Sequence, residues 1–310
     1  MSMSDRDGKI WKDGELVEWR EANTHILTHT LHYGMGVFEG IRAYETARGP
    51  AIFRLKEHIC RLFNSAKIFQ LEIPFDEETV RNSCVEVIRA NEYDSCYLRP
   101  LVWIGSDFLS IAAKNNTIHV ATAAWPMGSY LGEEGMEKGI RVKTSSFTRH
   151  HVNVSMVRAK ACGYYINSIL ANREVTSLGF DEALLLDTEG YVSEGAGENI
   201  FMVRDGVVYT PDLASCLDGI TRDSVMVIAR DLGLEIREKR ITRDELYCCD
   251  EAFFTGTAAE VTPIRELDGR TIGAGSRGPI TRQIQEIYFS AVRGTNEKYA
   301  HWLTYVDSRM

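Results

Sequence analysis

The sequence contains no apolar run that approaches the roughly 20 residues of a membrane-spanning helix. The polar residues 1–7 lack the apolar segment of a secretory signal, so we expect no export by that route. No basic tract occurs, and 44 acidic against 35 basic residues give a formal net charge of −9. That balance disfavours nucleic acid, because proteins that bind it present clustered positive charge to the phosphates. We therefore expect neither a membrane nor nucleic acid among the partners.

The cysteines show neither the even count of a disulfide framework nor a C-x-x-C pair. The seven are Cys60, Cys84, Cys96, Cys162, Cys216, Cys248 and Cys249. Several lie in apolar surroundings, so we expect reduced thiols in a cytoplasmic enzyme. With 310 residues, 44% hydrophobic and 25% charged, the chain has an ordinary globular composition and enough length for two domains or one large one.

Strand-like and helix-like segments follow one another in the first part of the chain, which predicts an α+β fold. Helical spacing of apolar residues runs from about 56 to 70, and Asp76 is a plausible N-cap for a second helix. The expected strands are 8–11, 37–44, 51–53, 97–104 and 117–124. The pattern then breaks at W-P-M-G-S-Y-L-G, a segment punctuated by proline and glycine. We place there an interdomain loop, 125–136, between a small N-terminal domain, 1–124, and a larger C-terminal domain, 137–310.

The second part of the chain is again mixed. Its expected strands are 140–147, 182–187, 234–240 and 251–256, and its expected helices are 163–178, 222–232 and 280–292. A hairpin is predicted from strands 199–204 and 207–210, because Asp205-Gly206 is a preferred two-residue turn.

Two charged residues in the middle of the chain stand among small neighbours. Lys160 lies in R-A-K-A-C-G-Y-Y, which leaves space for a flat ring beside an amine that can condense with an aldehyde. Glu194 follows in the glycine-rich run S-E-G-A-G-E-N. A buried amine and a buried carboxylate are what pyridoxal phosphate needs at opposite ends of its ring, which points to amino-group transfer. Taken alone, Lys160 could instead be a solvated surface lysine, as most lysines are.

Other segments could bind anions, and each has a simpler interpretation. The segment Gly219-Ile220-Thr221 opens a helix and could offer backbone N–H groups to a phosphate, or be a plain N-cap. Arg61 could bind the same phosphate, or extend to solvent from its apolar helix stripe. The strand Y-L-R-P places Tyr97 and Arg99 on one face, where the arginine could meet a substrate carboxylate or point outward. The turn T-G-T-A-A-E could bind an α-carboxylate or be only a tight turn.

Three patterns are rejected as sites. The run G-A-G-S-R-G at 273–278 matches a dinucleotide-binding fingerprint, but too little chain follows for a βαβ unit. The glycines at 34–40 precede a strand rather than a helix. His25, His29 and His32 have ligand-like spacing, but the apolar residues between them indicate packing, and we expect no metal.

The ordered motifs together resemble those of the branched-chain amino acid aminotransferases, which are class IV (fold type IV) pyridoxal phosphate enzymes. The resemblance covers about 24–302. It rests on H-Y-G-M-G-V-F-E-G-I-R, E-H-I-C-R-L, Y-L-R-P, R-A-K, S-E-G-A-G-E-N, G-I-T-R-D and T-G-T-A-A-E-V-T-P-I. It implies a two-domain α+β fold, with a small α/β N-terminal domain, a larger pseudo-barrel C-terminal domain and the cofactor between them.

The resemblance also implies the roles of individual residues. Lys160 would be the catalytic residue and would form a Schiff base with pyridoxal 5′-phosphate. The other cofactor-binding residues would be Glu194 at the pyridine nitrogen, Tyr165 at the ring hydroxyl, and Arg61, Ile220, Thr221 and Thr257 at the phosphate. The substrate-binding residues would be Tyr33, Phe38, Gly40, Tyr97, Arg99, Met127, Tyr130, Thr257 and Ala258, with Arg99 taking the distal carboxylate of glutamate.

The implied activity is transamination between leucine, isoleucine or valine and 2-oxoglutarate, in a homodimer or homohexamer. A class IV D-amino acid or R-amine transaminase, an aminodeoxychorismate lyase and a protein that merely binds the cofactor are the alternatives. The chain departs from some relatives at Met127, where they carry tryptophan, and in the loop 106–113, which lacks their glycines. In the family that loop reaches the neighbouring subunit's site, which makes Ile111 a candidate pocket wall.

Overall fold

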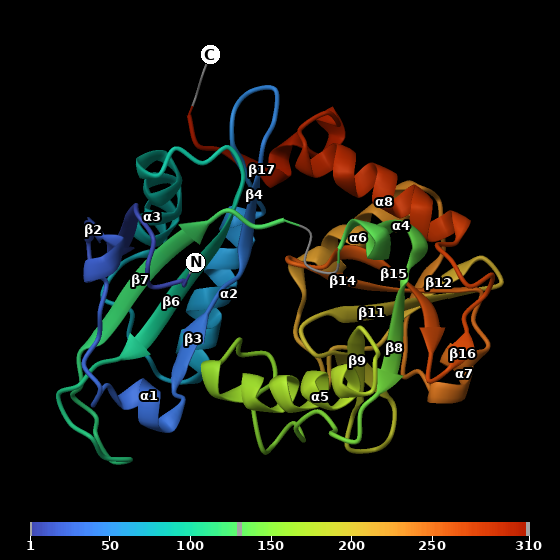
Figure 1. Ribbon diagram of the computed structural model, residues 1–310, viewed down its shortest axis with the longest axis horizontal. Helices are drawn as coiled ribbons and strands as arrows, with labels where there is room; N and C mark the ends of the chain where they lie inside the picture. The colour runs from blue at the N-terminus through green and yellow to red at the C-terminus, as the bar shows by residue number, and fades with distance from the viewer. Residues whose placement is uncertain (1, 129–131, 308–310) are drawn as a thin grey trace. The chain divides into compact units, whose positions relative to one another are not determined.

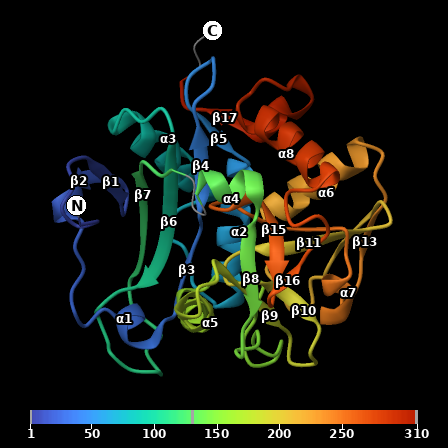
Figure 2. The ribbon, with the colours of Figure 1, turned by 45° about the vertical axis from the view of Figure 1, so that its right-hand side comes forward.

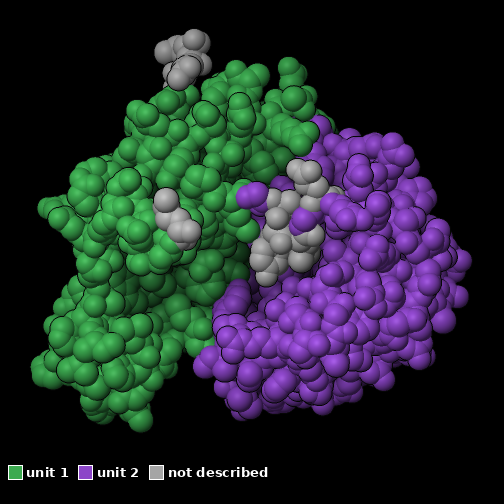
Figure 3. Space-filling view, in the orientation of Figure 1, with its two compact units in different colours: residues 1–127, 159–164, 291–310 green, residues 128–158, 165–290 purple. Residues whose placement is uncertain are grey.

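The computed structural model describes residues 2–128 and 132–307, and the chain forms two compact units (Figure 3). The first unit comprises Met1–Met127, Ala159–Tyr164 and Ala291–Met310, and the second comprises Gly128–Arg158 and Tyr165–Ser290. Each unit mixes helices with one large sheet (Figure 1), which confirms the expected α+β class. None of the helices in the described part of the chain is both long and apolar enough to cross a bilayer.

The first unit is built on a sheet with the strand order β17-β5-β4-β6-β7-β1-β2, in which β3 also pairs with β6. Its strands are β1 (Lys9–Lys12), β2 (Glu15–Glu18), β3 (Gly36–Phe38), β4 (Ile41–Tyr44), β5 (Ala51–Phe53), β6 (Cys96–Ile104), β7 (Ile118–Trp125) and β17 (Leu303–Tyr305). Its helices are α1 (His29–Tyr33), α2 (Leu55–Ile68) and α3 (Glu77–Ala90). Helix α3 packs on β7, β1 and β6, and α2 packs on α3 and β3, so that their aliphatic faces form the core. The Asp76 carboxylate accepts the backbone N–H of Thr79 at 2.7 Å, which confirms the predicted N-cap.

The expected strand 37–44 is wrong in one respect, because it is two strands that are interrupted at Glu39-Gly40. Both keep one register against β6: Phe38 pairs with Leu101, and Ile41 pairs with Leu98. Between these pairs the Glu39 N–H donates to the Pro100 carbonyl at 2.8 Å. Proline has no N–H with which to return the bond, so the ladder breaks at this position.

The second unit is a sheet that closes on itself. The pairing path β10-β9-β8-β15-β14-β11 returns to β10, while β12 and β13 extend from β11. This closure confirms the implied pseudo-barrel. The strands are β8 (Ile140–Thr144), β9 (Glu182–Leu186), β10 (Val192–Gly195), β11 (Asn199–Arg204), β12 (Val207–Thr210), β13 (Ile236–Glu238), β14 (Glu251–Gly256), β15 (Glu260–Leu267) and β16 (Arg270–Thr271).

Helices cover this barrel (Figures 1 and 2). They are α4 (Glu133–Lys138), α5 (Tyr165–Ser177), α6 (Ile220–Asp231), α7 (Arg243–Tyr247) and α8 (Pro279–Val292). Helix α4 packs on β15, α5 packs on β9 and β8, and α6 packs on β14 and β13.

The predicted hairpin is confirmed, with Asp205 at φ 51° and Gly206 at φ 76°, as its turn requires. Strand β15 is absent from the expected strands because Pro263 interrupts its pattern, although it pairs on both sides.

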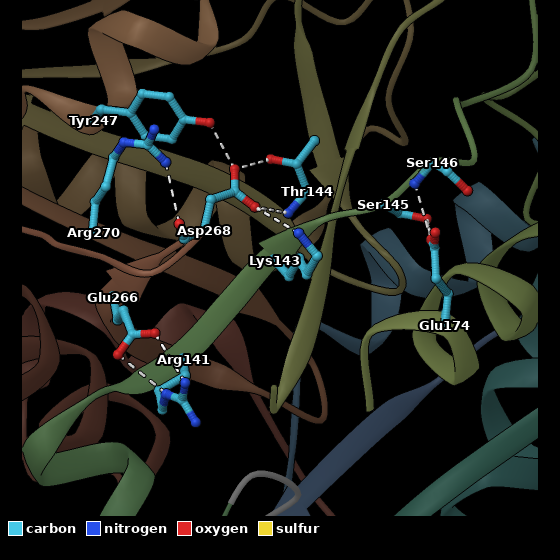
Figure 4. A network of polar contacts seen from close by, with 10 residues as sticks. All are labelled: Arg141, Lys143, Thr144, Ser145, Ser146, Glu174, Tyr247, Glu266, Asp268 and Arg270. Atoms are coloured by element: carbon cyan, nitrogen blue, oxygen red, sulfur yellow. Dashed lines mark hydrogen bonds and ion pairs between the residues drawn. The ribbon is translucent and has the colours of Figure 1, made fainter. Parts of the chain in front are cut away.

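A polar network ties β8 to the turn after β15 (Figure 4). The Asp268 carboxylate accepts the backbone N–H and the hydroxyl of Thr144, and the hydroxyl of Tyr247, each at 2.7 Å. Burial raises the pKa of Asp268, but these hydrogen bonds outweigh it and leave the pKa below its ordinary value. Nearby, Glu174 accepts the Ser146 N–H at 2.9 Å and the Ser145 hydroxyl, which fastens α5 to the end of β8. These bonds end the strand expected over 140–147 at Thr144.

The glycine-rich run 273–278 has a structural purpose. The buried carboxylate of Glu251 accepts the backbone N–H groups of Ile280 at 2.9 Å and Thr281 at 2.7 Å, in the first turn of α8. A Cβ atom on Gly278 would lie 2.1 Å from the Glu251 carboxyl carbon. The protein's own carboxylate therefore takes the anion position at this helix N-terminus, which explains why the resemblance to a dinucleotide site misleads.

We expect Glu251→Gln to lower the free energy of unfolding by about 1–3 kcal/mol, because the amide loses the charge and turns an N–H toward one of the donors. Urea unfolding followed by circular dichroism measures the change. The matched control is Glu266→Gln, which breaks the half-exposed pair with Arg141 and should cost less than about 1 kcal/mol. Equal losses in the two variants would contradict the capping role of Glu251.

Candidate active site

The backbone around Lys160 is held in the first unit by hydrogen bonds to residues of that unit. The Phe38 N–H donates to the Lys160 carbonyl at 3.0 Å, and the Lys160 N–H donates to the Ser65 hydroxyl at 3.0 Å. The Gly163 N–H donates to the Gly34 carbonyl at 3.1 Å. Outside this backbone frame, the Lys160 amine lies 5.2 Å from the centroid of the Phe38 ring. The backbone is therefore fixed while the amine projects along an aromatic face.

The small residues beside Lys160 serve packing as well as ring space. A Cβ atom on Gly34 would lie 3.0 Å from the Gly163 Cα, so the two backbones approach too closely for larger residues. Ala161 is buried and forms a β-bridge with Val37. The small residues beside Lys160 are therefore explained in part by this close backbone packing, and not only by the predicted space for a flat ring.

Arg61 lies on α2 and meets the buried carboxylate of Glu39. Its Nε donates to Oε1 at 2.7 Å, and its Nη2 donates to Oε2 at 2.9 Å. The His58 ring lies one turn earlier on the helix, with Nδ1 2.7 Å from Oε2. The side chain therefore turns inward. The simpler interpretation of Arg61, in which its side chain extends to solvent, is wrong. Neither Glu39 nor His58 is among the predicted site residues.

Arg99 lies in a cage of aromatic rings. Its guanidinium carbon is 4.5 Å from the ring centroid of Phe38, 5.3 Å from that of Tyr97 and 6.0 Å from that of Trp125. The Arg99 Nη2 donates to the Tyr97 hydroxyl at 3.1 Å, whereas its buried Nε finds no hydrogen-bond partner among the described residues. A cation on aromatic faces with an unused buried donor is suited to an incoming carboxylate.

Gly40 allows this arrangement, because a Cβ atom there would lie 2.0 Å from the Tyr97 hydroxyl oxygen. The structure thus brings Phe38, Gly40, Tyr97, Arg99 and Lys160 together in the first unit. Trp125 belongs with them and is missing from the predicted residues. Its only sequence signal is its place on the strand next to Y-L-R-P, where it pairs with Tyr97.

The remaining predicted residues of the first unit stand at its margins. Tyr33 ends α1 and is half exposed, with its ring 4.7 Å from that of His29. His29 and His32 bond the backbone carbonyls of Ser110 and Ile26 through Nε2. The packing expected from the apolar residues between the histidines is wrong, because Ile26, Leu27 and Leu31 are all exposed in the described chain. The carbonyl of Met127 accepts Arg42 Nη2 at 3.1 Å. Ile111 is 90% exposed, and the predicted residue Tyr130 lies outside the described residues.

In the second unit, Glu194 is a buried carboxylate with three donors. Arg149 Nη2 lies 2.7 Å from Oε1. The Leu217 N–H donates to Oε2 at 3.2 Å, and Asn199 Nδ2 donates to it at 3.3 Å. Sequence reasoning missed Arg149, because no motif marks it. The available signal was chemical, since a buried carboxylate requires a cationic partner.

The helix expected from residue 222 begins earlier, at Ile220, with Gly219 as its N-cap. Gly219 has no side chain with which to cap this N-terminus, and Ile220 and Thr221 are both buried in its first turn. A Cβ atom on Gly219 would lie 1.9 Å from Asn199 Oδ1, so the glycine lets Asn199, the first residue of β11, pack against the start of α6. First-turn N–H groups without a side-chain cap are suited to binding phosphate.

Thr257 and Ala258 lie in the turn that joins β14 to β15. At the end of β14 the Thr255 hydroxyl is buried, with no hydrogen-bond partner among the residues described. Tyr165 is the first residue of α5. These groups match the parts of pyridoxal phosphate in chemical kind. The N–H groups at 219–221 and the guanidinium of Arg61 suit its phosphate, the carboxylate of Glu194 suits its ring nitrogen, and the amine of Lys160 suits its aldehyde.

Residues 36–267 match the family model described as amino-transferase class IV. A branched-chain-amino-acid aminotransferase of Pseudomonas aeruginosa is 58% identical over 306 residues, which is 99% of this chain and 100% of that protein. The Escherichia coli enzyme of the same name is 43% identical over 300 residues, covering 96% and 97%.

Solved structures agree with these relatives. A T.th. branched-chain amino acid aminotransferase with pyridoxamine 5′-phosphate superposes with a TM-score of 0.95 at 53% identity, covering 97% of this chain and 99% of that chain. The same enzyme complexed with N-(5′-phosphopyridoxyl)-L-glutamate gives a TM-score of 0.94 at 53% identity, with the same coverage.

We expect Arg149→Met to lower the free energy of unfolding by about 3–5 kcal/mol, because it leaves Glu194 buried without a charge partner. In a Glu194→Gln background the same change should cost much less. Urea unfolding of the four proteins of this cycle measures the coupling. Arg141→Met, which removes a half-exposed ion pair, is the control. Additive losses at positions 149 and 194 would contradict the coupling.

Proposed function

The chain belongs to the class IV amino-transferases, and we propose how its residues carry out the pyridoxal-phosphate-dependent exchange of an amino group between branched-chain L-amino acids and 2-oxoglutarate. The reaction converts leucine, isoleucine and valine to their 2-oxo acids and forms glutamate. The observation that carries the residue assignment is Lys160: its backbone is fixed on both sides by hydrogen bonds, while its amine lies over the ring of Phe38.

When bound, pyridoxal phosphate supplies an aldehyde that condenses with amines and a ring that accepts electrons. Lys160 is the catalytic residue. Its Nζ removes the proton from the substrate Cα and holds it until the proton is passed on, acting as general base and then as general acid. The fixed backbone matters here, because proton transfer needs the amine at one place in both half-reactions.

Glu194 would face the ring nitrogen and keep it protonated. Arg149 occupies one of its oxygens, and the Leu217 N–H and Asn199 occupy the other, which favours the charged carboxylate. An ionised carboxylate stabilises a neighbouring N–H cation. Tyr165, at the start of α5, would bond the ring hydroxyl.

The phosphate would be held by the fork of Arg61, the first-turn N–H groups at Ile220 and Thr221, and Thr257. The glycine N-cap of α6 supports this assignment, because Gly219 offers no side chain to the first-turn N–H groups. The α-carboxylate of the substrate would meet the turn at Thr257-Ala258 and the hydroxyl of Tyr97.

One pocket can serve two kinds of substrate through the aromatic cage of Arg99. The rings of Phe38 and Tyr97 provide apolar walls for branched side chains, with Tyr33, Gly40, Met127 and Tyr130 completing the proposed pocket. The Arg99 guanidinium carbon lies 4.5 Å from the Phe38 ring centroid and 5.3 Å from that of Tyr97, so an aliphatic side chain can pack on the same aromatic walls. Its unused Nε donor can then bind the distal carboxylate of glutamate.

We also place the enzyme in the cytoplasm, as a homodimer or homohexamer. All seven cysteines are free thiols, which suits a reducing compartment. Helix α5 presents Ile166, Ile169 and Leu170 to solvent, the first of them 65% exposed, while Ala171 and Val175 pack inward. An apolar stripe at helical spacing on an outer face supports an interface with a second copy.

Replacing the amine in Lys160→Ala should reduce turnover of L-leucine with 2-oxoglutarate by roughly 10³-fold or more, because it removes both the condensing group and the proton carrier. The visible absorption band of the Schiff base between Lys160 and the cofactor should be lost as well. Coupled assays of glutamate formation and absorption spectra measure the two effects. A variant that still transaminates at the wild-type rate would rule out Lys160 as the catalytic residue. D-alanine and 1-phenylethylamine, run beside L-leucine, distinguish the D-amino acid and R-amine alternatives.

Arg99→Met should separate the two substrate classes. We expect the KM for 2-oxoglutarate to rise by about 10- to 100-fold, since the variant loses a charged hydrogen bond, while the KM for leucine changes by less than about 3-fold. Half-reaction kinetics with each substrate measure both values. Arg81→Met, on α3, where the guanidinium pairs with Glu77, is a control for loss of a guanidinium in the same unit. Parallel losses for leucine and 2-oxoglutarate would contradict the proposed role of Arg99.

A further inference from the structure

Glu39 is an ionised group in a fully buried place. It lies in the break between β3 and β4, none of its surface is exposed, and its backbone N–H is bound to the Pro100 carbonyl. A buried carboxylate is stable only when it is paired and hydrogen-bonded. Both of its oxygens are accordingly bound by residues of α2, and Oε2 also accepts the backbone N–H of Gly40 at 3.3 Å.

The pairing is a two-point fork. The Nε of Arg61 donates to Oε1 at 2.7 Å, and its Nη2 donates to Oε2 at 2.9 Å, which fixes the plane of the guanidinium. His58 Nδ1 adds a third bond to Oε2 at 2.7 Å. Burial raises the pKa of Glu39, but the charge of Arg61 and the hydrogen bonds from Arg61 and His58 outweigh it and leave the pKa below its ordinary value, so the carboxylate stays ionised. Burial lowers the pKa of His58, so its neutral ring donates from Nδ1.

We propose that Glu39 is a positioning residue for the cofactor phosphate, which it serves by holding Arg61 in its binding orientation. The proposal rests on the role given above to Arg61. Without Glu39, an arginine beside the apolar residues Ile59 and Leu62 would extend toward solvent. The fork uses one edge of the guanidinium and thereby sets the direction of its other edge. A donor whose orientation is fixed in advance loses less conformational freedom when the phosphate arrives.

Glu39→Gln tests this inference, because the amide keeps the volume and one acceptor but loses the charge and half of the fork. We expect the dissociation constant for pyridoxal phosphate to rise by about 10-fold, with the KM for leucine at saturating cofactor changed by less than about 2-fold. Equilibrium dialysis of the holoenzyme, followed by cofactor absorbance, measures the first quantity. Thermal unfolding of the apoprotein separately records any loss of stability.

A double-mutant cycle with Arg61→Lys distinguishes positioning from a general structural role. Lysine cannot form the fork, so Glu39→Gln should weaken the cofactor by less than about 2-fold in that background. His58→Asn, which leaves the fork intact, should weaken binding less than Glu39→Gln does. If Glu39→Gln does not fold, Glu39→Asp replaces it: the charge is kept but the fork is displaced, so we expect a smaller rise in the dissociation constant.

Unchanged cofactor affinity in Glu39→Gln, or an equal effect with and without Arg61, would overturn the inference. A fall in apoprotein stability accompanied by wild-type cofactor affinity would do the same, because it assigns Glu39 to folding alone. Wild-type affinity in Arg61→Lys would instead contradict the phosphate role of Arg61 in the proposed function. A wild-type protein that binds no pyridoxal phosphate would contradict the proposed function as a whole.

Discussion

The chemistry of this chain depends on a set of backbone hydrogen bonds that carry Ala159–Tyr164 into the first unit. Bonds from Phe38 and to Ser65 fix the position of the Lys160 backbone, and the bond from Gly163 to Gly34 requires two glycines in contact. Side-chain packing alone would leave a short segment free to shift along its neighbours. Hydrogen bonds to a strand fix its register instead, so the amine is delivered to one place.

Buried carboxylates with arginine partners occur in each unit. Arg61 forks onto Glu39 in the first, and Arg149 meets Glu194 in the second. Each pair keeps a carboxylate charged where burial alone would favour its neutral form. The proposed uses differ, because Glu39 directs a cation toward an anion, whereas Glu194 itself would face a cationic ring nitrogen. The same electrostatic solution thus underlies both of the proposed roles.

Local sequence pattern predicted those features that local physics determines. The Asp76 cap, the hairpin turn at Asp205-Gly206 and most helices needed only neighbouring residues, and the family, the α+β class and the transaminase activity followed from the ordered motifs and are confirmed. The site residues themselves stay predictions. The partners of buried charges could not be found this way, because Arg149 and Glu194 are distant in sequence and no spacing rule relates them. The capping of α8 by Glu251 could not be predicted for the same reason, because Glu251 is distant from α8 in sequence and the glycine-rich run alone resembles an anion site.

The motifs F-E-G and Y-L-R-P, far apart in sequence, depend on each other through one strand irregularity. Pro100 on β6 has no N–H to donate to the neighbouring strand. Opposite it, at Glu39-Gly40, the pairing with β6 is interrupted between β3 and β4. At that break Glu39 turns its carboxylate to Arg61, and Gly40 leaves room for the Tyr97 hydroxyl beside Arg99. In a regular strand, consecutive side chains point to opposite faces, and positions 39 and 40 would be held to that alternation. One missing N–H group therefore supports both the proposed phosphate contact and the proposed substrate pocket.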